Sequence, residues 1–197
     1  DSYVAMTKDP ESRKILISNI INLINKYGFS GVDLDWETPT TEQAPYFTIF
    51  VKELREAVLK NNPHHIITAA ITGGKWQPSK YDLKNSGQYL DFINVMTYGM
   101  TSSSTAYQNA LYPRSGYNDS VNKVGQTLSS CSIHESVTIF NNYGIPNSKL
   151  IFGLAFYGVK QEKSGSSWSG GGSVYYTSIK ENYLNNSNYD YYYDEVA

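Results

Sequence analysis

The sequence predicts an α/β protein built on a parallel sheet. Four short apolar segments, typical of buried strands, are separated by helices or long crossovers, which is the pattern of a parallel sheet. The expected strands are 31–36, 66–71, 90–98 and 150–156. Two architectures share this pattern, the open doubly wound sheet and the closed (β/α)8 barrel. No glycine-rich phosphate loop follows any of these strands, which disfavours nucleotide binding.

Helices are expected around these strands. Isoleucines recur at helical spacing within 11–26, Pro10 suits the first turn of this helix, and Gly28 suits its C-terminal cap. Other segments are assigned by pattern alone: helices at 43–59, 135–143 and about 179–184, loops at 72–84 and 99–130, a glycine- and serine-rich linker at 164–173, and a tyrosine-rich strand after the last helix.

Composition disfavours several classes of function. The chain has 197 residues, of which 40% are hydrophobic, enough for the core of one domain or of a large part of one. A net charge of −2 without a basic patch argues against nucleic acid and anionic membranes as partners. No apolar run reaches the length of a membrane span. Cys131 is the single cysteine, so the chain cannot form an internal disulfide.

Three acidic residues alternate at the end of the first expected strand. Asp33, Asp35 and Glu37 occupy positions i, i+2 and i+4, which point to the same face of a strand. Carboxyl groups this close together cannot all stay ionised, and catalysis is the commonest reason for a fold to keep them. A site for magnesium, calcium or manganese and an acidic structural strand are the alternatives. No histidine partner for a metal is evident, since His64 and His65 lie at a helix–strand junction.

The sequence around this acidic segment resembles that of a known family. Residues 27–37 (YGFSGVDLDWE) resemble the signature of the family 18 glycoside hydrolases, the chitinases and their relatives, whose motif is D-x-x-D-x-D-x-E. Residues 89–98 (YLDFINVMTY) are similar to the family's sixth-strand segment, and residues 149–158 (KLIFGLAFYG) to its seventh. Shorter matches occur at 52–57 and 81–83. The resemblance covers almost the whole chain and favours the barrel over the doubly wound sheet.

The resemblance also implies how the chain is organised. Residues 1–158 are expected to form about strands four to seven of a TIM barrel, and 159–197 part of an α+β insertion. The remaining strands are expected before and after this chain, so an incomplete barrel is predicted. Two positions depart from the family pattern, because Ser30 replaces the first motif aspartate and Gly99 replaces an aspartate that usually follows the sixth strand. We expect the first change to retune the carboxylates and the second to remove a substrate contact.

The activity that the resemblance implies is hydrolysis of β-1,4-linked N-acetylglucosamine polymers with retention of configuration. Glu37 would protonate the glycosidic oxygen, and the substrate's own acetamido oxygen would attack, an exception to the two-carboxylate scheme. Asp35 would orient the acetamido nitrogen, and Asp33 would exchange a proton with Asp35. Tyr98 would donate a hydrogen bond to the acetamido carbonyl. Trp36 points away from these groups and is expected to pack outside the barrel.

Four further residues are assigned to substrate binding. Trp76 lies in a strand-end loop and is either a platform for a sugar ring or an anchor of that loop. Tyr157 ends the fourth expected strand on the active side, where it would line the cleft. Met96 and Gly99 are placed there by the resemblance. The expected partner is chitin or an N-acetylglucosamine oligosaccharide, with no cofactor or metal, and the protein is expected to be secreted and monomeric. The alternatives are a catalytically weak chitinase-like sugar-binding protein and an endo-N-acetylglucosaminidase or cell-wall glycosidase of the same family.

Overall fold

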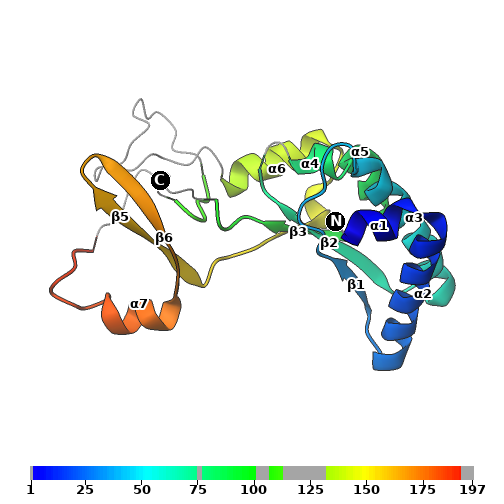
Figure 1. Ribbon diagram of the computed structural model, residues 1–197, viewed down its shortest axis with the longest axis horizontal. Coiled ribbons are helices and arrows are strands. Elements are labelled where there is room, and N and C mark those ends of the chain that lie inside the picture. The colour runs from blue at the N-terminus through cyan, green and yellow to red at the C-terminus, as the bar shows by residue number, and fades with distance from the viewer. Residues whose placement is uncertain (1, 75–76, 101–106, 113–131, 192–197) are drawn as a thin grey trace. The chain divides into compact units, whose positions relative to one another are not determined.

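The computed structural model describes residues 2–74, 77–100, 107–112 and 132–191 (Figure 1). The chain divides into two compact units, each of which is described by itself. The first unit comprises Asp1–Val95 and Val137–Phe152, and the second comprises Met96–Ser136 and Gly153–Ala197.

The first unit is built on a four-stranded sheet with the strand order β1-β2-β3-β4. Its strands are β1 (Gly31–Leu34), β2 (Ile66–Thr72), β3 (Phe92–Met96) and β4 (Leu150–Phe152). β1 is parallel to β2, and β3 is parallel to β4. The predicted parallel α/β sheet is therefore confirmed, and the described residues contain four strands of it rather than a closed eight-stranded barrel.

The helices expected at 11–26, 43–59 and 135–143 are present with slightly shifted ends, and a further helix at 2–8 was not expected. Those before and between the strands are α1 (Ser2–Lys8), α2 (Pro10–Tyr27), α3 (Ala44–Asn61), α4 (Gln77–Lys80), α5 (Leu83–Ser86) and α6 (Ile133–Asn142), with 3-10 turns η1 (Gly87–Tyr89) and η2 (Asn147–Lys149). The Asp9 carboxylate accepts from the Ser12 amide at the start of α2, and Gly28 ends it in the left-handed conformation. The short helices α4 and α5 correct the plain loop expected at 72–84.

The hydrophobic core of the first unit lies between the sheet and the helices α2 and α3, which run along one side of it (Figure 1). Alternate residues of β2, namely Ile67, Ala69 and Ile71, are fully buried there. The other core residues that these elements contribute include Ile17, Leu34, Phe47, Phe50, Val51, Leu54, Val58, Ile93 and Val95. Residues that alternate with these along the strands, among them Asp33, Thr68 and Asn94, therefore lie on the opposite face of the sheet.

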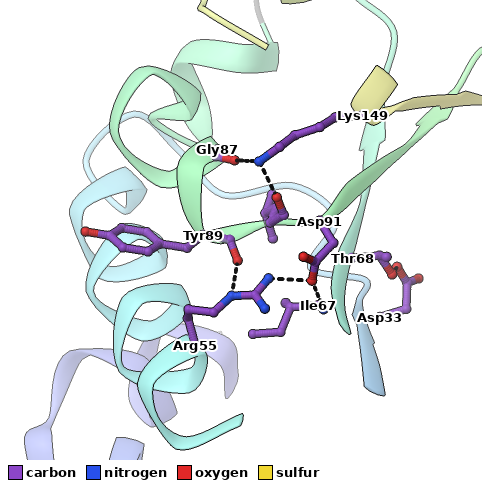
Figure 2. Close-up of polar contacts among 9 residues, drawn as sticks. Asp33, Arg55, Ile67, Thr68, Gly87, Tyr89, Asp91 and Lys149 are labelled. Carbon is purple, nitrogen blue, oxygen red and sulfur yellow. Dashed lines mark hydrogen bonds and ion pairs between the residues drawn. The ribbon is translucent and has the colours of Figure 1, made fainter. Parts of the chain in front are cut away.

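An ion pair ties α3 to the beginnings of the strands (Figure 2). Arg55 on α3 donates from Nη2 to Asp91 Oδ2 at 2.5 Å and from Nε to the Tyr89 carbonyl at 2.8 Å. The same Asp91 oxygen accepts from the Ile67 amide at 2.7 Å. Lys149 donates to the backbone carbonyls that precede Asp91, and burial lowers the pKa of its ammonium group. One carboxylate thus joins a helix to two strands.

We expect Asp91→Ala to lower the free energy of unfolding by about 2–3 kcal/mol, because it leaves the Arg55 guanidinium and the Ile67 amide without their acceptor. Urea denaturation monitored by circular dichroism measures this change. Glu56→Ala removes an exposed carboxylate from the same helix and should change the free energy by less than about 0.5 kcal/mol. Equal effects of the two substitutions would contradict the stabilising role of Asp91.

The described part of the second unit contains an antiparallel hairpin followed by a helix. Its elements are β5 (Tyr157–Ser164), β6 (Ser167–Tyr175) and α7 (Tyr176–Asn182). The predicted linker at 164–173 is therefore wrong, because most of it forms β6. Ser164 pairs with Ser167 across a two-residue turn in which Gly165 has a φ of 61°. Glycine and serine carry no apolar alternation, so the strand was not visible in the sequence.

Two other strand assignments in this region are corrected. β4 ends at Phe152, so Tyr157 does not end that strand but begins β5. The intervening Gly153 carbonyl accepts hydrogen bonds from the side chains of Thr97 at 2.9 Å and Asn109 at 3.3 Å, which replace ladder partners. The expected tyrosine-rich strand is also wrong over the described residues up to 191, where Tyr189 instead packs edge-on against a tyrosine that follows α7.

Candidate active site

Asp33 is held by side chains from the next two strands of the sheet. Its Oδ1 accepts hydrogen bonds from Thr68 Oγ1 on β2 and from Asn94 Nδ2 on β3, the latter at 2.9 Å. Asp33 and Thr68 are register partners in the parallel ladder and lie side by side, apart from the Arg55–Asp91 ion pair (Figure 2). These contacts fix the carboxylate of the first acidic position in place.

The acidic segment keeps its alternation after the strand has ended. Hydrogen bonding in β1 stops at Leu34, so the predicted extension of this strand to residue 36 is wrong. Asp35 and Glu37 nevertheless stay exposed, whereas Trp36 between them is only 3% exposed. The indole of Trp36 stacks on Tyr3 at 5.2 Å between ring centroids and packs against α3. The predicted common face of the three carboxyl groups, with Trp36 on the opposite side, is confirmed.

Burial of Glu37 and its neighbour Asp35 both favour the neutral form of the Glu37 carboxyl group. Partial removal of the Glu37 carboxyl from water raises its pKa above the ordinary value. The negative charge of Asp35 and a hydrogen bond between the two side chains raise the pKa of Glu37 further. A neutral Glu37 can donate its proton to Asp35, and the pair can exchange that proton with a bound molecule. A carboxylic acid that stays neutral above its usual range is suited to general acid catalysis.

The remaining predicted site residues belong to the second unit or lie outside the described residues. Met96, Tyr98, Gly99 and Tyr157 are all in the second unit. Gly99 has a φ of 64°, and a Cβ at this position would lie 3.9 Å from the Tyr157 hydroxyl, so the two residues are neighbours. Trp76 lies outside the described residues.

Sequence reasoning missed the two residues that hold Asp33. Thr68 and Asn94 are polar residues inside the apolar strand runs IITAAI and FINVM. Their phase along the strand puts them on the face opposite the main core cluster, and this was the available signal. Among the described residues, no group of three or more histidine, cysteine, aspartate or glutamate side chains is arranged to hold a metal ion. No helix in the described ranges is both long and apolar enough to cross a membrane.

A face with hydrogen-bonded carboxyl groups at the end of a parallel strand is the kind of site that α/β-barrel hydrolases carry. The profile of Glycosyl hydrolases family 18 matches residues 1–197, so the chain belongs to this family. Its predicted family is thereby confirmed, and the TIM-barrel fold class follows from that family, whereas the described residues themselves show a four-stranded sheet with helices. Probable chitinase 10 of Drosophila melanogaster is 29% identical over 171 residues, which are 80% of this chain and 7% of that protein. Chitotriosidase-1 of Mus musculus is 28% identical over 185 residues, which are 87% and 38% of the two chains.

Solved structures agree in fold. Chitinase ChiA74 from Bacillus thuringiensis superimposes with a TM-score of 0.81 at 22% identity, covering 98% of this chain and 36% of that one. A chitinase-like agglutinin from Robinia pseudoacacia superimposes with a TM-score of 0.74 at 27% identity, covering 95% and 59%. The chain spans less than half the length of the two curated relatives.

Proposed function

We propose that this chain carries the acid of a glycosidase that cleaves β-1,4-linked N-acetylglucosamine polymers by a retaining, substrate-assisted mechanism. The observation that carries the proposal is the Asp35–Glu37 pair, in which Glu37 has a raised pKa and a hydrogen-bonded carboxyl partner. Membership of the glycosyl hydrolase family and the chitinase relatives support the substrate class. Chitin or its oligosaccharides would be the partner, and the protein would act as a secreted monomer.

The proposed reaction has two steps. The acetamido oxygen of the bound sugar attacks the anomeric carbon while the glycosidic C–O bond breaks and its oxygen takes the Glu37 proton. Asp35 accepts a hydrogen bond from the acetamido N–H and stabilises the positive charge that develops on the ring formed by this attack. Water then attacks the anomeric carbon while the bond from this carbon to the acetamido oxygen breaks, and the water passes a proton to the Glu37 carboxylate. Two inversions give overall retention, and Glu37 ends as the acid it was.

Tyr98 is proposed as the donor to the acetamido carbonyl. Tyr98→Phe in the complete enzyme should lower kcat by about 10²-fold, the scale for loss of one donor that stabilises developing charge. Steady-state kinetics on a chitin oligomer measures this effect. Tyr112→Phe, at an exposed tyrosine of the described residues, is the matched control and should leave kcat within about twofold. A wild-type rate for Tyr98→Phe would exclude this hydroxyl from the mechanism.

A comparison of substrates tests the proposal against its alternatives. One preparation of the complete protein is assayed on chitin oligomers, a high-mannose glycopeptide and peptidoglycan. Cleavage of the chitin oligomers with retention supports the proposal. Cleavage of the glycopeptide or of peptidoglycan alone would instead assign an endo-N-acetylglucosaminidase or a cell-wall glycosidase of the same family.

Sugar binding with weak catalysis is the second candidate function. It is favoured by the two departures from the family motif, Ser30 and Gly99, and by the structural likeness to a chitinase-like agglutinin. The intact Asp33, Asp35 and Glu37 argue for catalysis. Binding of a chitin oligomer in calorimetry without turnover of any of the three substrates would favour the sugar-binding function.

We further propose that residues 1–158 are part of the catalytic barrel and that residues 159–197 are part of an α+β insertion. The hairpin and helix of the second unit, which begin at Tyr157, support this division. Met96, Gly99, Tyr157 and Trp76 are proposed as substrate-binding residues, and the proximity of Gly99 to Tyr157 supports the placement of these two.

A further inference from the structure

The peptide segment that carries the acidic pair lies beyond the β-ladder and is held by two tyrosine hydroxyls. The Asp35 carbonyl accepts a hydrogen bond from the hydroxyl of Tyr3 on α1 at 3.2 Å. The Trp36 carbonyl accepts one from the hydroxyl of Tyr81 at 2.7 Å. Because peptide units are planar, the first contact fixes the plane that leads into Trp36 and the second fixes the plane that leads into Glu37. Tyrosine side chains thus take over the role of a neighbouring strand.

Tyr81 is itself firmly placed in the core. It lies between α4 and α5, is only 1% exposed, and packs edge-on against the Phe47 ring at 5.2 Å between centroids. Its own carbonyl accepts a hydrogen bond from Ser86 Oγ at 2.8 Å. Phe47 also contacts the Trp36 indole, so the donor and the acceptor of the Tyr81 hydrogen bond rest on the same side chain. The hydroxyl of Tyr81 is therefore presented by a rigid support.

The hydroxyl of Tyr81 also lies in the electric field of both carboxyl groups. Burial raises the pKa of Tyr81, and the negative charges of Glu37 and Asp35 raise it further. The hydroxyl therefore stays protonated and keeps donating over the whole pH range in which an acid such as Glu37 titrates. Within the described part of the first unit, the titratable groups that interact electrostatically with Glu37 are Asp35, from its own segment, and Tyr81, from the loop between α4 and α5.

We propose that Tyr81 is a positioning residue of the active site, whose hydroxyl holds the Trp36 peptide so that Asp35 and Glu37 stay within hydrogen-bonding reach of each other. Tyr3 supports the preceding peptide in the same way from a more exposed position, since it is 42% exposed. The inference rests on the proposed function of the acidic pair. In the hydrogen bonds described, the Tyr81 side chain touches neither reacting carboxyl group. The inference is that this buried tyrosine nevertheless affects catalysis.

Tyr81→Phe tests the proposal because it keeps the ring and removes only the hydroxyl. In the complete protein, kcat on a chitin oligomer should fall by about tenfold, with KM within about twofold of wild type, because substrate contacts are kept while the acid is misplaced. The alkaline limb of kcat should move to lower pH, because Glu37 loses its hydrogen bond to Asp35. Tyr89→Phe is the matched control, since Tyr89 is half-buried and its carbonyl is the atom that Arg55 binds.

A second readout separates this inference from the proposed function. The titration of the Glu37 carboxyl is followed by NMR with 13C-labelled glutamate, and the signal is assigned with Glu37→Gln. Tyr81→Phe should lower the pKa of Glu37 and Tyr89→Phe should not, whether or not the protein cleaves chitin. Tyr3→Phe, on the exposed side, should lower the pKa of Glu37 by a smaller amount. This variant replaces Tyr81→Phe as the test if Tyr81→Phe fails to fold. An unchanged Glu37 titration in a folded Tyr81→Phe protein, or in Tyr3→Phe where only that variant folds, would overturn the inference.

Discussion

Glu37→Gln is expected to lower kcat of the complete enzyme by about 10²–10⁴-fold, the range that a general acid contributes. Glutamine keeps the shape of the side chain but has no proton to give to the glycosidic oxygen. Substrate binding should persist, and calorimetry with a chitin oligomer measures it separately from turnover. Glu42→Gln, an exposed glutamate five residues further on, is the matched control and should leave kcat unchanged.

A change in the substrate, rather than in the enzyme, tests which group is the nucleophile. A chitin oligomer that lacks the acetyl group on the sugar at the cleaved bond has no internal nucleophile, so the wild-type enzyme should not cleave it at that bond. Rapid cleavage of this oligomer, or a sugar covalently trapped on Asp35, would show that a protein carboxylate attacks instead. Either result would exclude the substrate-assisted mechanism, although Glu37 would remain the acid.

Asp35→Asn is expected to lower kcat by about 10²–10³-fold, the scale for loss of one group that stabilises developing charge, and to change the pH profile. The substitution removes the negative charge and weakens the hydrogen bond that raise the pKa of Glu37, so this pKa should fall. Partial burial still acts on Glu37, so its pKa should stay above the ordinary glutamate value. Because the acid must be protonated, activity is lost as pH rises through this pKa, and the alkaline limb of residual kcat should move to lower pH.

Kinetics of Asp35→Asn over a range of pH, compared with those of Glu42→Gln, checks this expectation. Both variants remove one carboxylate from the same stretch of chain, so a general effect of net charge would appear in both. A limb that stays in place or moves to higher pH in Asp35→Asn would mean that Asp35 does not raise the pKa of Glu37.

The regular elements of the first unit could be predicted because their patterns are local. The isoleucine periodicity of α2, together with Pro10 at its first position and Gly28 after its last, indicates both ends of the helix. The apolar run of β2 likewise indicates a buried strand by its own residues. The β5–β6 hairpin could not be predicted, because β6 is rich in glycine and serine and its pairing depends on β5 rather than on its own side chains.

Some residues of the candidate site could likewise be predicted from local sequence, and others could not. Asp33, Asp35 and Glu37 could be named from their spacing, because alternation alone brings them to one face. Thr68 and Asn94, which bind Asp33, come from other strands, so their convergence depends on register. Tyr81 could not be assigned a role, because its hydrogen bond to Trp36 joins residues 45 positions apart and depends on how α3 packs.

Because buried and exposed residues alternate along the acidic segment, one set of positions serves folding and the other set serves the chemistry. Leu34 and Trp36 face the core, whereas Asp33, Asp35 and Glu37 face away from it. A library that randomises residues 32–37 should therefore lose folded protein through the even positions and turnover through the odd ones. Selection for folding alone would leave the odd positions free to drift, so an inactive descendant could keep this backbone and acquire a new role at the same surface.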